Sequence, residues 1–302
     1  MQRAFGYIRF ILRFGVFNSL MRANNHFKVW RVDSLAELHT GNTSITDSQT
    51  HDGYSFLCDS AVRDDLIFSK FRSCVSIVDV LDHVTLAQAK QYASFITEKN
   101  SPAINHDRLK IAKKIDSIGD PLRWHLREFG IISPTIVRYL KVYGDLERLF
   151  GPIKDFDIAE IGIGFGGQTA VNARLGGASR FKLYDLPVVL GLAEKFLLAT
   201  HSDVKFEGID GRRPESSSPD LVISNYAFSE VSRELQDLYL TNVILNSSRG
   251  YLTWNNSAED KLEGYTLAEL LRLIPNSQIL PEIPLTSTYN SIIVWGHRIG
   301  TY

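Results

Sequence analysis

Hydrophobic and polar positions follow two different periodic patterns along this chain, and one pattern replaces the other near residue 151. From Ser76 to Arg127, apolar residues recur at the spacing of one helix face, with interruptions at Ser101-Pro102 and at Gly119-Asp120-Pro121. The preceding stretch, Ala23 to Asp64, is polar and only weakly periodic. We therefore expect residues 1–150 to form a mostly helical N-terminal or cap region.

A helix start is marked near the end of this region. Ser133 followed by Pro134 has the residue types preferred at an N-cap and at the first helical position. The helix is expected to continue through Arg138 and Tyr139 and to end before Gly151. The pattern thus predicts a helix directly before the second half of the chain.

After Gly151, short runs rich in β-branched and aromatic residues alternate with longer helical windows, which is typical of a parallel sheet built from alternating strands and helices. The predicted strands are Asp157 to Ile161, Phe181 to Tyr184, Val204 to Glu207, Leu221 to Ser224, Tyr251 to Trp254, Gln278 to Glu282 and Ser291 to Trp295. The last two are too close in sequence for a crossover helix, so they should pair as an antiparallel hairpin. The expected fold class is α/β, with a Rossmann-like domain over residues 151–302 whose seven-stranded sheet ends in that hairpin. This ending is typical of class I methyltransferases.

A glycine-rich loop follows the first predicted strand and precedes a predicted helix, the context in which such a loop binds a nucleotide cofactor. Glycine lets the backbone turn tightly and approach a ligand closely. Gly162, Gly164 and Gly167 satisfy the dinucleotide fingerprint. Glu160 with Gly162, Gly164 and Gly166 satisfies the methyltransferase pattern of an acid followed by alternating glycines.

Acidic residues near this loop help to distinguish a nicotinamide dinucleotide from S-adenosylmethionine as the cofactor. Asp185, at the end of the second strand, could accept hydrogen bonds from ribose hydroxyls of either cofactor. Glu160 would sit poorly beside a pyrophosphate but well beside the ammonium and sulfonium charges of S-adenosylmethionine. Asp210, after the third strand, is placed to meet the adenine amino group. The pattern favours S-adenosylmethionine.

Composition narrows the function further. Among 302 residues, 33 lysines and arginines nearly balance 34 aspartates and glutamates, so the chain shows no overall attraction to nucleic acid. The two cysteines, Cys58 and Cys74, are too few for a disulfide framework, which favours a reducing, cytoplasmic location. From Ala4 to Met21 the chain is rich in apolar residues, but Arg9 and Arg13 interrupt any run long enough to span a bilayer. A helix packed on its own protein or one lying weakly on a membrane surface both fit this segment.

Several segments together resemble the bacterial sugar O-methyltransferase family, over about the last two thirds of the chain. They are Glu160 to Gln168, Tyr184-Asp185-Leu186-Pro187, Ser224 to Glu230 and Asn290 to Gly296, and the likeness extends upstream through Gly119 to Pro121 and Ser133 to Tyr139. The resemblance implies methylation of a sugar hydroxyl in a surface polysaccharide or its precursor. The expected cofactor contacts in and beside these segments are Glu160, Gly162, Gly164, Gly166, Gln168, Asp185, Leu186, Asp210, Asn225 and Arg138, the last to the cofactor carboxylate.

A sugar hydroxyl is a weak nucleophile, so methyl transfer needs a group that takes its proton. In this topology the acceptor faces the ends of the fourth and fifth strands, which makes Tyr226, Ser229 and Glu230 catalytic candidates. Glu230 is the first candidate for the base, although it could equally stabilise the start of a following helix. His297, at the end of the last strand, and His125 are weaker alternatives.

The acceptor itself could be held by side chains at the same strand ends. We expect Asn255, Glu282 and Asn290 to bind substrate hydroxyls, although each could instead bond local backbone. No histidine and cysteine cluster has metal-ligand spacing, so no metal is expected.

Two other functions remain open at this point. A nicotinamide-dependent oxidoreductase acting on a sugar nucleotide shares the glycine spacing, and a non-catalytic scaffold for glycan assembly is compatible with the lack of an unmistakable base. The partners expected are a sugar or glycan substrate, no nucleic acid, and a second copy of the chain if it forms a homo-oligomer.

Overall fold

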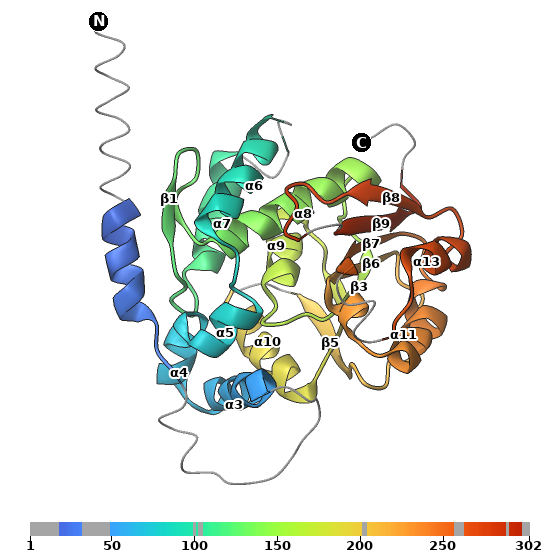
Figure 1. Ribbon diagram of the computed structural model, residues 1–302, viewed down its shortest axis with the longest axis horizontal. Coiled ribbons are helices and arrows are strands. Elements are labelled where there is room, and N and C mark those ends of the chain that lie inside the picture. Colours follow the sequence, from blue (N-terminus) through green and yellow to red (C-terminus); the bar gives the residue numbers. More distant parts are fainter. Residues whose placement is uncertain are drawn as a thin grey trace, which may run out of the picture.

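A computed structural model of the chain describes residues 18–31, 49–98, 101, 105–200, 204–256, 263–287 and 290–297. Figure 1 shows a mostly helical half beside a half built around a twisted sheet. A search of the described helices for a membrane span finds none that is long and apolar enough. The segment from Ala4 to Met21, one alternative for which is a helix on a membrane surface, lies largely outside the described residues.

The helical half begins with a helix over residues 18–28, which lies against a small antiparallel hairpin. Asn18 and Asn25 of this helix exchange hydrogen bonds with the backbone of His125 and Arg123. The remaining elements are α3 (Gln49–Arg63), α4 (Asp65–Lys70), η1 (Phe71–Ser73), α5 (Val75–Val80), α6 (Leu86–Glu98), α7 (His106–Asp116), β1 (Trp124–Leu126) and β2 (Gly130–Ile132). The hairpin of β1 and β2 was not predicted, because each strand is only 3 residues long and carries no alternation.

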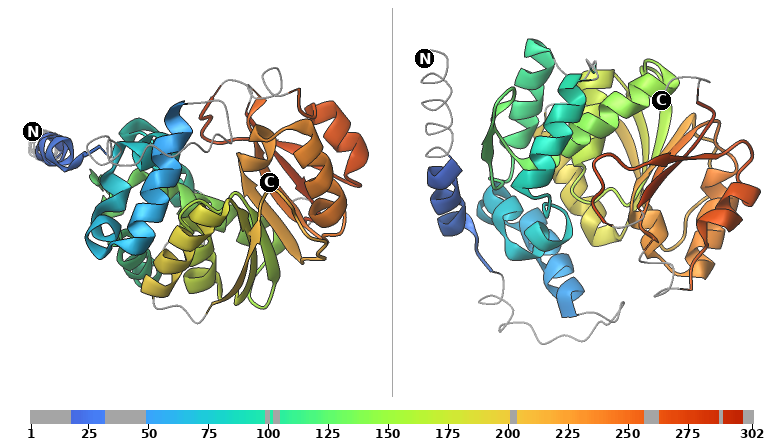
Figure 2. Two further views of the ribbon diagram at one scale, coloured as in Figure 1. Left: turned by 90° about the horizontal axis from the view of Figure 1, so that it is seen from below. Right: turned by 45° about the horizontal axis from the view of Figure 1, so that its top comes forward.

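Helix α8 (Pro134–Phe150) links the two halves and confirms the predicted start. Ser133 is its N-cap, with its side chain accepting a hydrogen bond from the Ile136 amide, and Pro134 occupies the first turn. The helix ends at Gly151, whose φ of 81° is strained for other residues. Nearly every side chain of α8 is buried, because the helix lies between the helical half and the sheet (Figure 2).

The sheet of the second half contains β3 (Asp157–Ile161), β4 (Arg180–Asp185), β5 (Lys205–Asp210), β6 (Leu221–Asn225), β7 (Gly250–Trp254), β8 (Gln278–Pro281) and β9 (Ser291–Trp295). Its spatial order is β5-β4-β3-β6-β7-β9-β8. The first five are mutually parallel, and β9 is antiparallel both to β7 and to β8. This confirms the predicted strands, the terminal hairpin and the Rossmann-like class I methyltransferase fold. The finding that the sequence pattern did not supply is that β9 inserts between β7 and β8.

The helices cover both faces of the sheet. One face packs against α8, α9 (Gly167–Gly176), α10 (Pro187–Ala199) and the helical half, in a single hydrophobic core. The other face packs against η2 (Ala227–Glu230), α11 (Arg233–Tyr239), η3 (Leu240–Ile244) and α13 (Leu267–Leu273). The first core includes Leu57 and Ile77 as well as Ile158 and Val294, so hydrophobic packing is continuous across the predicted boundary at residue 150.

A buried arginine joins the helical half to the sheet half. Arg72 is 0% exposed, and its guanidinium donates to Asp82, to Asp116 and to the hydroxyl of Ser133. The same group lies 4.8 Å from the ring centre of Phe165, in the glycine-rich loop. A buried charge is tolerated only with such partners, so these contacts hold the cap elements in one arrangement.

We expect Arg72→Met to lower the free energy of unfolding by about 3–5 kcal/mol, because it leaves the buried carboxylates of Asp82 and Asp116 without their shared cation. Urea denaturation followed by circular dichroism measures this change. Arg63→Met, which breaks an exposed pair with Asp59, is the matched control and should cost less than about 1 kcal/mol. Equal effects of the two substitutions would contradict the central role of Arg72.

Candidate functional site

The carboxyl ends of the parallel strands form one edge of the sheet, and the order of connections reverses between β3 and β6. A crevice at such a reversal is where open α/β sheets bind ligands. Since β9 runs the other way, its first residues lie at this same edge, with Ser291 opposite Trp254. The edge therefore collects the ends of β3, β4, β5, β6 and β7 together with the segment that links β8 to β9.

The glycine-rich loop turns at this edge as predicted. Gly162, Gly164 and Gly166 have φ values of 74°, 55° and 89°, a region that disfavours other residues. A Cβ at Gly162 would lie 2.0 Å from the Cβ of Ala227, and one at Gly164 would lie 3.0 Å from Cδ2 of Leu81. The loop is thus covered closely by the turn after β6 and by a residue of the cap.

Glu160 does not face this crevice, contrary to its predicted contact with the cofactor. Its side chain is 2% exposed and points to α9, where it accepts a hydrogen bond from Thr169. Burial raises its pKa to about 8, more than the Thr169 hydrogen bond lowers it. Alternation along β3 explains the difference, because Glu160 and Ile158 point to the same buried face. In this structure Glu160 joins β3 to α9 in the protein interior.

Asp185 lies at the predicted place beside the loop. Its carboxylate accepts hydrogen bonds from the amides of Gly164 (3.0 Å) and Leu186 (2.8 Å). Burial raises its pKa to about 6, and these amides act in the opposite direction. Each carboxylate oxygen has a second lone pair available for a ribose hydroxyl. Leu186 itself contributes its amide to Asp185 and its side chain to the core.

Asp210 ends β5 in register with Asp185. Its carboxylate is bound by the guanidinium of Arg212, at 2.6 Å between Oδ2 and Nη2, and by the Arg212 amide. These hydrogen bonds lower the pKa of Asp210. Asp210 thus stands at the expected edge, but an arginine occupies the oxygens that were predicted to meet adenine.

Gln168 is the other cofactor candidate that the structure places in the interior. Its amide nitrogen donates to the carbonyl of Tyr139 (3.3 Å) and to Asn172 (3.0 Å), and the side chain is 1% exposed. It joins α9 to α8. Although Gln168 is only the second residue of α9, its side-chain amide is directed to α8 and to Asn172 in the interior.

The turn after β6 brings together the predicted catalytic residues. Tyr226 has φ 74° and ψ −36°, a strained backbone conformation of the kind that clusters at functional sites. The Ser229 hydroxyl donates to the Tyr226 carbonyl (2.6 Å) and accepts from the Asn255 amide (3.0 Å). The Ser229 hydroxyl therefore joins the ends of two neighbouring strands.

Glu230 is exposed at the end of this turn and accepts a hydrogen bond of 2.9 Å from the side chain of Asn255. Helix α11 begins only at Arg233, with Ser232 as its N-cap. Glu230 is thus paired with Asn255 across neighbouring strand ends, in a position to meet a ligand at the edge.

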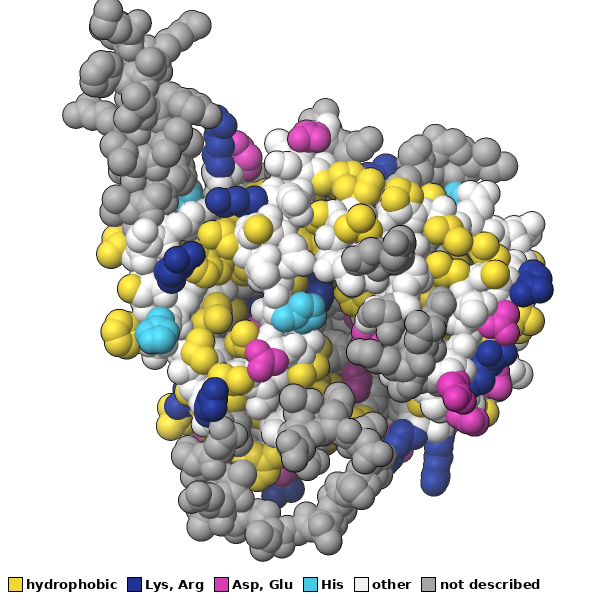
Figure 3. Space-filling model, viewed as in Figure 1, with side chains coloured by type: hydrophobic (Ala, Val, Ile, Leu, Met, Phe, Trp, Pro, Cys, Tyr) yellow, Lys and Arg dark blue, Asp and Glu magenta, His cyan; other side chains and the backbone are white. Residues whose placement is uncertain are grey.

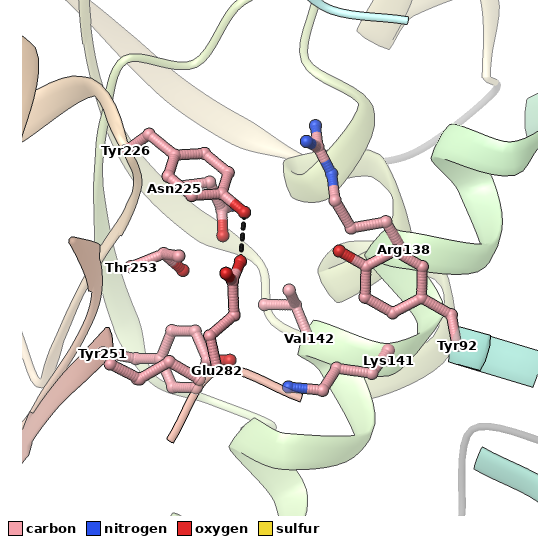
Figure 4. Close-up of a pocket in the computed structure, with 10 residues that line it drawn as sticks. Tyr92, Arg138, Lys141, Val142, Asn225, Tyr226, Tyr251, Thr253 and Glu282 are labelled. Carbon is pink, nitrogen blue, oxygen red and sulfur yellow. Dashed lines mark hydrogen bonds between the residues drawn. The ribbon is translucent and has the colours of Figure 1, made fainter. Parts of the chain in front are cut away.

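A small pocket opens beside this turn, between α6, α8 and the end of β8 (Figure 4). Its volume is about 10 Å³, which is near the least space that holds one water molecule. The residues around it are Tyr92, Arg138, Lys141, Val142, Asn225, Tyr226, Tyr251, Thr253, Glu282 and Ile292. The helical half thus supplies one wall and the sheet half the other.

Glu282 and Tyr226 form the sheet-side wall. The Tyr226 hydroxyl donates to Glu282, and Thr286 donates to the same carboxylate from its amide at 2.9 Å. Asn290 donates from its amide nitrogen to the Thr286 hydroxyl at 3.1 Å, while its buried Oδ1 has no partner among the described residues. Burial, followed by the charge of Glu282, raises the pKa of Tyr226 well above its usual range. The predicted substrate residues Glu282 and Asn290 therefore belong to one cluster.

The histidine candidates lie elsewhere. His297 follows β9, whose Trp295 lies opposite Gly250 at the start of β7, so this residue is at the amino edge of the parallel strands. Its Nε2 lies 3.2 Å from Oε1 of Gln278. His125 lies in β1, against the helix of residues 18–28. Neither histidine therefore lies at the carboxyl edge of the sheet, where the other predicted site residues gather.

The structure brings forward residues that sequence reasoning missed. His83, between α5 and α6, has an exposed side chain whose pKa is lowered by partial desolvation of the ring and then by the charge of Arg138. Its contact with the Val80 carbonyl and the charges of Asp82 and Glu230 act against this. Tyr92 reaches the pocket from α6. Neither residue belongs to a local sequence motif, so they can be recognised only once the packing of the helical half on the sheet edge is known. In the view of Figure 3, charged and histidine side chains lie near the centre of the molecule.

A search of the described residues for groups of histidine, cysteine, aspartate and glutamate able to hold a metal ion finds none.

No family model matches the chain, and no curated protein matches its sequence. Similar solved structures include protein 1320 of Thermoplasma acidophilum, with 15% identity and a TM-score of 0.40, covering 64% of this chain and 97% of that one. The ribosomal protein L11 methylase of Lactobacillus delbrueckii subsp. bulgaricus has 15% identity and a TM-score of 0.36, covering 52% and 77%. TehB of Haemophilus influenzae has 12% identity and a TM-score of 0.38, covering 51% and 60%. At such identities, the substrates of these proteins are not transferred to this chain.

The buried carboxyl of Glu160 generates a prediction on pH. Its pKa of about 8 lies above the ordinary 4.5, so its contribution to stability is full below pH 4.5 and is lost as pH rises through about 8. The free energy of unfolding should fall by a few kcal/mol between about pH 5 and pH 9. Urea titrations across this range should show a smaller fall in Glu160→Gln, because the amide cannot ionise. A fall of equal size between about pH 5 and pH 8 in both proteins would contradict the assignment.

Proposed function

We propose that this protein is an S-adenosylmethionine-dependent methyltransferase. The observation that carries the proposal is the glycine-rich loop at the reversal between β3 and β6, in a sheet whose β9 is inserted antiparallel before the edge strand. Asp185 stands next to this loop with lone pairs available for ribose hydroxyls. The alternative function, a nicotinamide-dependent oxidoreductase, has no comparable support from the order of the strands.

The acceptor we propose is a hydroxyl of a sugar, in a bacterial surface polysaccharide or its precursor. The resemblance of the sequence segments supports this choice, and the character of the pocket fits it. Tyr92, Tyr226, Thr253 and Asn225 offer neutral hydrogen-bonding groups between aromatic and aliphatic side chains. Sugars are bound by such combinations of polar groups and rings. The pocket must widen before a sugar enters, since its present volume is about 10 Å³.

The chemistry required of the protein is positioning and proton removal. The sulfonium of the donor supplies an activated methyl group, and the protein aligns the attacking hydroxyl with it. Glu230 is the group we assign to take the proton, because it is exposed at the carboxyl edge and Asn255 holds one of its oxygens at 2.9 Å. His83 is the competing candidate, since its lowered pKa keeps the imidazole neutral near pH 7.

Binding of the cofactor tests the proposed class directly. We expect S-adenosylmethionine and S-adenosylhomocysteine to bind with dissociation constants on the order of micromolar, as measured by isothermal titration. NAD should not bind in the same range. Preference for NAD, or the absence of binding by all of these compounds, would reject the methyltransferase proposal.

The proposed role of Glu230 as the base is tested by measuring the rate of methyl transfer. Glu230→Gln should keep the hydrogen bond from Asn255 and the affinity for S-adenosylhomocysteine, and should lower methyl transfer by about two to four orders of magnitude. Transfer of a labelled methyl group to surface glycans of a strain that lacks the protein gives the readout. Glu207→Gln, an exposed carboxylate on β5, is the matched control and should retain full turnover. Undiminished turnover in Glu230→Gln together with loss in His83→Gln would assign the base to His83 instead.

A further inference from the structure

Arg138 is a buried cation whose charge no partner in the described residues balances. Its side chain is 8% exposed, its Nε has no hydrogen-bond partner, and no carboxylate is found within ion-pair distance of its guanidinium in the described parts of the chain. An arginine stays charged inside a protein, so its desolvation must be offset by an anion or by hydrogen bonds.

Other buried cations of the same region are paired. Arg72 binds Asp82 and Asp116, and Lys141, one turn after Arg138 on α8, binds Asp145 at 2.5 Å. The chain therefore supplies carboxylate partners to these two buried cations. Arg138 is the exception in this part of α8, and this contrast indicates that its anion comes from outside the chain.

The groups that surround Arg138 do not supply a negative charge. Its guanidinium carbon lies 5.4 Å from the ring centre of Tyr139 and 5.9 Å from that of Tyr226. Burial raises the pKa of Tyr139 and of Tyr92 to about 12, so these phenols stay protonated at neutral pH. The rings attract the cation and the Tyr139 side chain hydrogen-bonds to it, but these neutral groups leave its charge unbalanced and its Nε without a partner.

The position of Arg138 identifies the region that the anion must occupy. Tyr139 touches the start of α9, since a Cβ at Gly167 would lie 2.3 Å from its ring, and Tyr226 follows β6. The guanidinium near both rings thus lies between the ends of β3 and β6, at the reversal of the sheet. Figure 4 shows its side chain across the pocket from Tyr226 and Glu282, with the guanidinium turned away from Glu282.

We propose that Arg138 is the receptor for a ligand carboxylate at this crevice. Guanidinium groups bind carboxylates through paired hydrogen bonds, which fix orientation as well as position. This inference rests on the proposed function, in which two ligands can supply the group. The amino-acid end of the methyl donor carries a carboxylate, and a uronic acid acceptor would carry another.

The position favours the donor. With its adenosine end at Asp185, beside β4, a donor that follows the glycine-rich loop across the crevice brings its amino-acid end to β6. Arg138 then sets the position of the sulfonium relative to the acceptor by holding the opposite end of the same short chain. It acts as a binding and positioning residue.

The test compares two ligands of the full-length protein by isothermal titration. One is S-adenosylhomocysteine, and the other is S-adenosyl-3-thiopropylamine, which lacks only the carboxylate. The wild type should bind the first about ten- to a hundredfold more tightly, the usual worth of a charged hydrogen-bonding pair. Arg138→Met should lose this preference by weakening S-adenosylhomocysteine alone. Arg148→Met, a cation of α8 that pairs with Asp145, should keep it.

Thermal unfolding separates a ligand role from a structural one. Without ligand, Arg138→Met should melt at the wild-type temperature or above it, because it removes an uncompensated buried charge. A lowered melting temperature together with equal weakening of both ligands would overturn the inference and make Arg138 structural. Equal binding of both ligands by the wild type, with uronate binding also unaffected by Arg138→Met, would overturn it as well.

The remaining outcomes assign the source of the carboxylate. If Arg138→Met keeps the preference between the two nucleosides but loses the binding of glucuronate to the complex with S-adenosylhomocysteine, the carboxylate is that of the acceptor. If the wild type binds neither nucleoside, the proposed function fails, and this result is distinct from a failure of the role of Arg138.

Discussion

The arrangement of this protein depends on the burial of the Arg72 guanidinium. Its partners come from segments far apart in the chain: Asp82 precedes α6, Asp116 ends α7 and Ser133 caps α8. If Asp82 moved away, its own buried carboxylate would lose its cation and Arg72 would keep only Asp116, which would cost several kcal/mol. Since Asp82 is held in this way, its neighbour Leu81 is held too, and Leu81 is the residue that packs on Gly164. One buried cation therefore determines how closely the cap approaches the glycine-rich loop.

The sheet was predictable because its signals are local. The central strands β3, β6, β7 and β9 each have a compact apolar run, and the glycines, Asp185 and the Ser133-Pro134 helix start can be recognised within a few residues. The clustering of Asn225, Glu230, Asn255, Glu282 and Asn290 at one edge follows from strand direction once the terminal hairpin is recognised. These parts of the site required no knowledge of how the helical half packs.

The predicted site residues that lie elsewhere in the structure share one physical cause. A motif identifies a place in the chain but not the direction in which a side chain points. Glu160 matches its pattern, yet the alternation of β3 turns its carboxyl to Thr169 in the interior. His297 matches a strand end, yet the antiparallel course of β9 puts that end at the opposite edge. His83 and Tyr92 carry no motif, and their approach to the site depends on contacts between residues distant in sequence. Such contacts leave no periodicity to read.

The insertion of β9 between β7 and β8 has a consequence for synthesis on the ribosome. Strand β8 pairs within the described sheet only with β9, and β7 completes its hydrogen bonding on that side only with β9. Residues 291–295 must therefore leave the ribosome before the backbone hydrogen bonds of either strand can form. Until then the unpaired edge of β7 stays available to other chains. The parallel strands and their helices can assemble earlier during translation, whereas the acceptor side of the crevice is completed last.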